Sequence, residues 1–159
     1  MVTPPVARRR ARGFTIPELM TGIAIMGIMG AVAAPSFSDL IDAQRAKGAA
    51  SDIFTSLLRT RSEAIKRNAP VTMTPAEGGW AAGWSVAHPT NDDVLLEDRG
   101  AVNGVTVSGP DSVTFLPNGR LSGSDAPAFD VAAAGADKHR CIEVDLSGRP
   151  YQTPEACPE

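Results

Sequence analysis

The stretch that decides the fold runs from residue 13 to residue 38 and reads GFTIPELMTGIAIMGIMGAVAAPSFS. Between Ile16 and Phe37 it holds 22 residues and a single charged side chain, Glu18. An α-helix rises about 1.5 Å per residue, so this stretch is roughly 33 Å long, which matches a hydrocarbon layer about 30 Å thick. We therefore predict a membrane-spanning helix over residues 14–38.

The charge pattern predicts how this helix is oriented. The first 13 of the 159 residues contain no acid and carry +4, whereas the remaining 146 carry −7. The cations of this basic stub are Arg8, Arg9, Arg10 and Arg12. Because positively charged flanks stay in the cytoplasm, we expect the carboxyl-terminal part on the outer side of an inner membrane, in the periplasm. An acidic body of this size excludes a generic nucleic-acid binder and a large multidomain enzyme.

Physical chemistry alone leaves two interpretations of the apolar segment open. One is a secretory signal peptide, cut after the small residues Ala31-Val32-Ala33, and the other is a retained membrane anchor. Glu18 bears on the choice, because a carboxylate at mid-helix in a bilayer costs on the order of 2.5–3.5 kcal/mol. Neither a disposable signal nor a simple anchor gains from this cost. The acid therefore suggests a partner, such as the amine of a neighbouring subunit.

The segment Gly13-Phe14-Thr15-Ile16-Pro17-Glu18-Leu19 resembles the processing motif of type IV prepilins. The resemblance implies that a prepilin peptidase removes residues 1–13 as a leader, cutting between Gly13 and Phe14. It further implies that Phe14 becomes an N-methylated first residue and that Glu18 is the acid that pairs with another subunit. Residues 14–38 would then be retained as an assembly helix.

Two prolines interrupt the expected helix. Pro17 replaces the usual aliphatic residue of the motif and is tolerated, because amides in the first helical turn lack intrahelical partners. Pro35 follows Gly27 and Gly30, so this part of the helix is expected to bend or unwind easily. Pilins are similar in having a proline here, which implies that the segment melts when subunits pack into a filament. A simple kink is equally consistent with the residues.

A second, amphipathic helix is expected over residues 39–68, joining the apolar segment to a globular head. Its apolar face follows i, i+3, i+4 spacing and comprises Ala50, Ile53, Phe54, Leu57, Leu58, Arg61, Ala64 and Ile65. Asn68 and Pro70 provide the stop signal. The eight residues from Arg61 to Asn68, RSEAIKRN, resemble the end of this helix in the GspH/FimT family of minor pilins and minor pseudopilins.

Residues 69–159 change to short β-prone runs separated by turn residues, which predicts an antiparallel head and an α+β, pilin-like fold. Strands are expected at 71–74, 83–87, 94–96, 102–107, 112–116, 129–131 and 140–145. Asn118-Gly119 and Ser147-Gly148 are expected to close hairpins, and Trp80 and Trp84 to lie in the core. Further resemblance to the family lies in GWAAGW, FLPNGR and SGR, starting at residues 79, 115 and 147.

Cys141 and Cys157 are the only cysteines. Their spacing is unlike that of a metal site, and in an oxidising compartment they indicate one disulfide, with two free buried thiols as the alternative. A loop of this length stabilises by about 3 kcal/mol in the chain-entropy model. The bond would tie the proline-rich tail to the strand that begins near Arg140.

No catalytic, metal or phosphate-binding motif is present, so we predict a protein that is not an enzyme and takes no cofactor or metal. His88 and His139 are the only side chains available as bases for a further alternative, a membrane-anchored periplasmic hydrolase. Asp92-Asp93 and Glu97-Asp98 lack EF-hand spacing and are interpreted as an acidic surface loop.

The resemblance implies a minor pilin or pseudopilin of a type IV pilus or a type II secretion pseudopilus. The expected partners are other subunits through the amino-terminal helix, the prepilin peptidase and the inner membrane. Some FimT-type pilins bind DNA during uptake through a motif resembling Gly-Arg-x-Arg, which here reads Gly148-Arg149-Pro150-Tyr151. DNA binding by a patch of Lys138, Arg140, Arg149 and Tyr151 is therefore the alternative. It would be weak and sensitive to salt, because only five cations accompany thirteen acids after Asn68.

Overall fold

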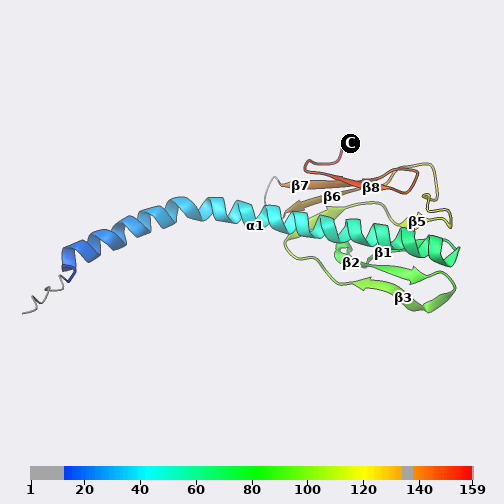
Figure 1. The fold of residues 1–159 in the computed structure, drawn as a ribbon, viewed down its shortest axis with the longest axis horizontal. Coiled ribbons are helices and arrows are strands. Elements are labelled where there is room, and N and C mark those ends of the chain that lie inside the picture. The colour runs from blue at the N-terminus through cyan, green and yellow to red at the C-terminus, as the bar shows by residue number, and fades with distance from the viewer. Residues whose placement is uncertain (1–12, 134–137, 159) are drawn as a thin grey trace, which may run out of the picture. The chain divides into compact units, whose positions relative to one another are not determined.

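The computed structural model describes residues 13–133 and 138–158 (Figure 1). It divides into two compact units, Met1–Ser38 and Asp39–Glu159, and helix α1 (Ile16–Arg67) contributes to both. The helical assignment continues through position 35, so the unwinding that Pro35 favours is not seen in the isolated chain. Melting of this segment on assembly stays a prediction.

Over the described residues, no helix is both long enough and apolar enough to cross a membrane. The membrane-spanning helix predicted over residues 14–38 is therefore not shown by the structure.

The head begins with the second half of α1, whose buried face carries alanines at both ends and larger side chains between them. The buried apolar residues on this face are Ala46, Ala49, Ala50, Ile53, Leu57 and Ala64. Leu58 and Ile65, which we placed on the same face, are 43% and 51% exposed. Each follows a buried residue by one position, and a step of one residue turns about 100° around the helix and away from the core. Asn68 ends the helix with a φ of 50°.

Two four-stranded antiparallel sheets pack against this part of α1 (Figure 1). One has the order β3-β2-β1-β5 and the other β4-β6-β7-β8. The strands are β1 Val71–Ala76, β2 Gly79–His88, β3 Asn91–Arg99, β4 Val105–Ser108, β5 Val113–Phe115, β6 Ala128–Ala133, β7 His139–Val144 and β8 Pro150–Thr153. All seven expected strands have a counterpart, and the antiparallel prediction is confirmed. β8 was not predicted; it begins at Pro150, and proline is tolerated at the start of an edge strand.

The core lies where α1 meets both sheets. Trp80 and Trp84 are buried there, as predicted. The Trp80 ring of β2 meets the Phe129 ring of β6 edge to face, with 4.8 Å between the ring centroids, so this pair links the two sheets. The Trp84 Nε1 atom donates a hydrogen bond of 2.9 Å to the buried Ser56 hydroxyl of α1.

Two expectations about loops have different outcomes. Ser147-Gly148 closes the β7–β8 hairpin, as predicted, through a 2.8 Å bond from the Gly148 N–H to the Asp145 carbonyl. Asn118-Gly119 forms a tight turn, but only an isolated bridge between Phe115 and Leu121 flanks it.

The residues interpreted as an acidic loop, Asp92-Asp93 and Glu97-Asp98, belong instead to strand β3, because Val94–Leu96 extends at both ends to pair with β2.

Candidate functional site

The predicted processing site lies at the start of α1. Gly13, Phe14 and Thr15 precede the helix, and together with Glu18 they line one open pocket. The Leu19 N–H donates to the Thr15 carbonyl at 3.1 Å, and the Glu18 carboxylate accepts a long bond of 3.4 Å from the Thr15 N–H. This is one of the two bonds of a capping box, the one in which an acid three residues after a threonine satisfies an amide at the helix start. The spacing Thr-x-x-Glu is visible in the sequence, but we did not predict the cap from it.

An uncovered apolar surface follows the processing site. Phe14 is 85% exposed, and the large apolar side chains of the next turns are all more than half exposed. They are Ile16, Leu19, Met20, Ile23, Ile25, Met26, Ile28 and Met29. A contiguous apolar surface of this size in water marks a membrane or protein interface.

In the head, α1 is tied to two distant turns by a single arginine. The Arg61 Nε atom donates to the Gly119 carbonyl at 2.9 Å, and its Nη2 atom donates to the Ser147 carbonyl at 3.3 Å. Gly119 and Gly148 have φ values of 76° and 80°, which suit glycine. A Cβ atom on Gly148 would lie 2.0 Å from the Gly119 carbonyl oxygen, so the two turns touch each other as well as Arg61.

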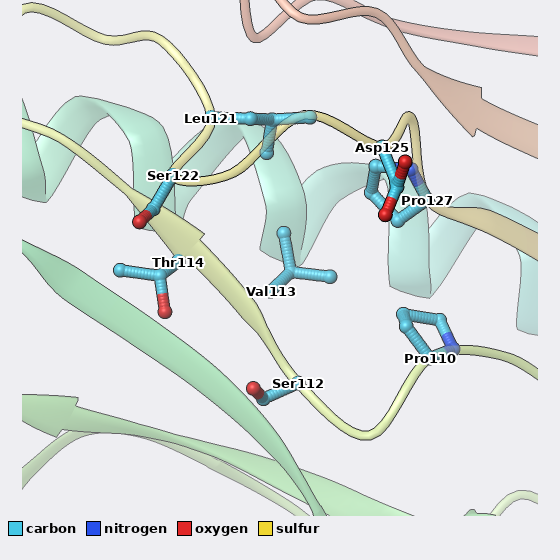
Figure 2. Close-up of a pocket in the computed structure, with 8 residues that line it drawn as sticks. All are labelled: Pro110, Ser112, Val113, Thr114, Leu121, Ser122, Asp125 and Pro127. Carbon is cyan, nitrogen blue, oxygen red and sulfur yellow. The ribbon is translucent and has the colours of Figure 1, made fainter.

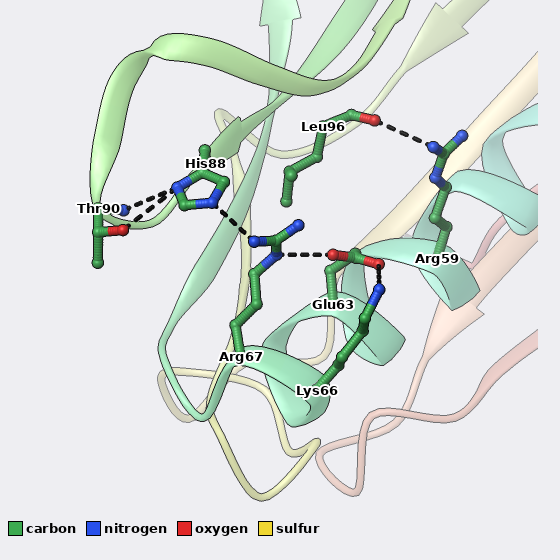
Figure 3. Close-up of polar contacts among 7 residues, drawn as sticks. All are labelled: Arg59, Glu63, Lys66, Arg67, His88, Thr90 and Leu96. Carbon is green, nitrogen blue, oxygen red and sulfur yellow. Dashed lines mark hydrogen bonds and ion pairs between the residues drawn. The ribbon is translucent and has the colours of Figure 1, made fainter.

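The end of α1 contacts the β2–β3 turn through a chain of polar groups. Figure 3 shows the Glu63 carboxylate between Lys66 and Arg67, with the Arg67 Nε atom 2.7 Å away. Hydrogen bonding to the Arg67 guanidinium, assisted by the charge of Lys66, holds the pKa of Glu63 below its ordinary value. The Arg67 Nη1 atom lies 2.7 Å from the His88 Nε2 atom. Since arginine only donates, Nε2 accepts this bond, and the Thr90 N–H and hydroxyl each lie 3.3 Å from the His88 Nδ1 atom.

Strand β3 is fastened to α1 by three further polar contacts. Ser56 donates to one oxygen of Glu97, Arg99 pairs with Asp52, and the Arg59 guanidinium donates to the Leu96 carbonyl at 3.1 Å. The other Glu97 oxygen is buried without a hydrogen bond, and the Arg59 Nη1 atom lies 3.7 Å from it. These contacts hold the strand edge against the helix.

The disulfide between Cys141 and Cys157 is present, as predicted. It attaches the tail to the outer face of β7, where the Cys157 N–H also lies 3.4 Å from the Asp130 carboxylate. The Asp130 carboxylate contacts the His139 Nδ1 atom at 2.9 Å.

The four residues proposed to bind DNA do not form one patch. Lys138 and Arg140 lie at the start of β7, whereas Arg149 lies beyond its far end, where the Asp145 N–H donates to the Arg149 carbonyl. The five residue steps from Arg140 to Asp145 separate these ends by about 16 Å. Tyr151 pairs with Glu143 across the hairpin, and a hydrogen bond to that carboxylate raises the pKa of Tyr151. An acid beside the ring disfavours an approaching phosphate.

One pocket of about 190 Å³ lies between β5 and the loop that leads to β6 (Figure 2). Its polar groups are the hydroxyls of Ser112, Thr114 and Ser122 and the carboxylate of Asp125. A lone carboxylate among hydroxyls contains neither a base with a nucleophile nor a set of metal ligands, so no chemistry follows from it.

Comparison with known proteins places this arrangement in a family. Residues 49–148 match the family described as Type II transport protein GspH, and residues 8–34 match the prokaryotic N-terminal methylation motif. The chain belongs to the GspH family. It is 32% identical over 80 residues to the Type II secretion system protein H of Xanthomonas campestris pv. campestris. That match covers 49% of this chain and 47% of the relative, so it spans about half of each.

Two solved structures share the fold of this GspH-family chain. The type IV minor pilin FimU of Pseudomonas aeruginosa superposes with a TM-score of 0.60 at 20% identity, over 68% of this chain and 87% of FimU. The minor pseudopilin EpsH of the Vibrio cholerae type 2 secretion system has a TM-score of 0.56 at 13% identity, over 69% and 97% of the two chains. The predicted family and pilin-like fold are confirmed.

Proposed function

We propose that this chain is a minor structural subunit of a type II secretion pseudopilus or a type IV pilus, with no catalytic role. The observation that carries the proposal is the uncovered apolar surface that begins at Phe14, within the stretch that matches the methylation motif. A compact head with its own core follows it. Such a chain needs other molecules to cover its first helix, and subunits that carry the same helix are the natural partners.

The processing step follows from the motif. A prepilin peptidase cuts between Gly13 and Phe14 and methylates the new amino terminus. Before assembly, the chain is anchored at the inner membrane through its amino-terminal segment, with the head in the periplasm. During assembly the helix leaves the lipid, and the Glu18 carboxylate pairs with the amino terminus of a neighbouring subunit. That pairing removes an uncompensated charge from an apolar setting.

The structure sharpens the test of Glu18, because this side chain also caps its own helix. Glu18→Gln retains an oxygen that accepts from the Thr15 N–H but abolishes the charge, whereas Glu18→Ala removes both. If the carboxylate pairs with an amine, both variants fail to enter filaments, while their heads stay folded. The measurement is the amount of each variant in sheared, purified filaments relative to the amount in the membrane fraction.

A matched control is Glu77→Gln, which removes an acid from the exposed β1–β2 turn of the head. It should assemble as the unaltered protein does. Normal assembly of Glu18→Gln together with failure of Glu18→Ala would show that only the helix cap matters, and the pairing mechanism would be wrong.

A further inference from the structure

A pocket of about 200 Å³ opens where α1 passes the start of β7. Its helical wall has only small side chains, Ala43 and Ala46, and Pro154 of the tail closes another side. Lys138, His139 and Arg140 complete the lining. The pocket lies entirely within the unit Asp39–Glu159.

Two cations of this pocket have no charged partner in the part of the chain that the structure describes. Among the described residues, neither the Lys138 nor the Arg140 side chain has a hydrogen bond or ion pair, whereas Arg59, Arg67 and Arg99 all contact carboxylates. On the adjoining part of α1, the Asp42 carboxylate is paired with Arg45 at 3.2 Å. The His139 ring contacts the Asp130 carboxylate, so the uncompensated charge of the pocket comes from Lys138 and Arg140.

The chemistry of Lys138 and Arg140 favours a phosphate group as their ligand. Arginine presents a planar fork of donors that matches phosphate oxygens, and lysine adds a compact positive charge. Lys138 and Arg140 are separated by one residue of extended chain, which places both side chains on the same side of it. Alanines on the opposite wall leave room for the ligand.

The position of the pocket in the chain identifies the source of that phosphate. Ala43 is five residues beyond Ser38, where the amino-terminal unit ends. Five residues extend at most about 18 Å in any conformation, so the pocket stays close to the segment that anchors the chain. We propose that Lys138 and Arg140 bind the phosphate headgroup of an anionic phospholipid and hold the head at the membrane surface before assembly. This inference rests on the proposed function, in particular on anchoring at the membrane.

DNA is disfavoured as the source. An extended polyanion needs several cations along its path, but Arg149 lies at the other end of the β7–β8 hairpin and Tyr151 adjoins Glu143. A single phosphate headgroup, by contrast, needs only two cations, and Lys138 and Arg140 both line the pocket.

The test uses the full processed chain in lipid nanodiscs and the acetylation rate of its three lysines, Lys47, Lys66 and Lys138, measured by mass spectrometry with an uncharged reagent. Discs of phosphatidylcholine alone are compared with discs that also contain phosphatidylglycerol. Each cation near an anionic surface contributes about five-fold in binding, so acetylation of Lys138 should slow about five-fold in the anionic discs. Lys66, at the far end of α1, should react equally in both.

Two variants that each lose one arginine show which arginine contributes to the protection of Lys138. Arg140→Gln keeps most of the side-chain stem and should abolish the protection of Lys138, whereas Arg149→Gln should retain it. Equal rates for Lys138 in both kinds of disc would overturn the proposal. Equal slowing of Lys47 and Lys138 would also overturn it, because it would indicate that the anionic surface favours the unreactive ammonium form of every nearby lysine.

Two further arms distinguish other sources of phosphate. Soluble glycerol phosphate added to phosphatidylcholine discs should leave Lys138 unprotected, and so should a short DNA duplex. Full protection by either would overturn the assignment to lipid. The Glu18 variants report on assembly separately, so failure of the lipid site and failure of the proposed function are distinguishable.

Discussion

The Arg61 Nε atom of helix α1 donates to the Gly119 carbonyl at 2.9 Å, across 58 positions of sequence. The same guanidinium reaches the Ser147 carbonyl, 86 positions away, at 3.3 Å. Three short blocks that resemble the family, at the end of the helix and in two turns, therefore meet at one side chain. This junction fastens the sheet of β5 and the sheet of β7 to the same part of α1.

Replacing Arg61 with alanine should loosen this junction. Two backbone carbonyls lose a charged donor, which predicts a loss of about 2–3 kcal/mol in the free energy of unfolding of the head. Arg61→Lys should recover only part of it, because an ammonium lacks the planar fork. Both tryptophans are buried, so their fluorescence during urea unfolding in detergent measures the change. Arg120→Ala, at an exposed position in the adjacent turn, should be nearly neutral, and an equal loss in both alanine variants would refute the junction.

The contact between the turns at Gly119 and Gly148 predicts that a side chain added at Gly148 destabilises the head. An added Cβ atom would lie 2.0 Å from the Gly119 carbonyl oxygen, so the turns must separate. Gly123 also has a positive φ, 109°, but has open space around it. Gly148→Ala should therefore be less stable than Gly123→Ala by at least about 2 kcal/mol in the same urea experiment. Similar losses in the two variants would mean that backbone strain alone explains the effect.

The lowered pKa of Glu63 predicts that the free energy of unfolding of the head depends on pH. Its pKa lies below the ordinary 4.5 in the folded chain, chiefly because Arg67 donates a hydrogen bond to it. A depressed folded pKa stabilises the folded state fully above the unfolded pKa, and the contribution is lost as pH falls through the folded value. Glu63→Gln should accordingly be less stable than the unaltered chain at neutral pH, and the difference should vanish in strong acid. A difference that persists in acid would contradict the assignment.

Removing the disulfide should release the tail. Replacing both Cys141 and Cys157 with alanine removes a link between residues 16 positions apart, which predicts a loss of about 3 kcal/mol in unfolding free energy. Treating the unaltered chain with a reductant should lower its stability by a similar amount, whereas the double variant should not respond. Unchanged stability of both would show that the tail contributes nothing to the head.

Local patterns were enough to predict much of this fold. Helical spacing located the buried stripe through Ile53 and Leu57, and turn residues separated seven of the eight strands. The tail strand β8 was not predicted: it is four residues long and begins with a proline, which an edge strand tolerates. The capping role of Glu18 follows from the spacing Thr-x-x-Glu and was predictable.

Contacts set by tertiary packing were not predictable in the same way. No local pattern relates Arg61 to Gly119 and Ser147, or Arg67 to His88, because each pair meets only when helix and sheets dock. The grouping of Lys138 with Arg149 failed for the same reason: the β7–β8 register, which places them at opposite ends, is a property of the folded hairpin.

The intact mass of the protein extracted from membranes is the decisive measurement, because filament assembly requires a chain that keeps its apolar segment and loses its basic leader. We predict the mass of residues 14–159 with one disulfide and one added methyl group, located by fragmentation on the amino group of Phe14. A chain that begins at Ala34 would contradict the proposed assembly, because the segment that joins subunits would then have been discarded.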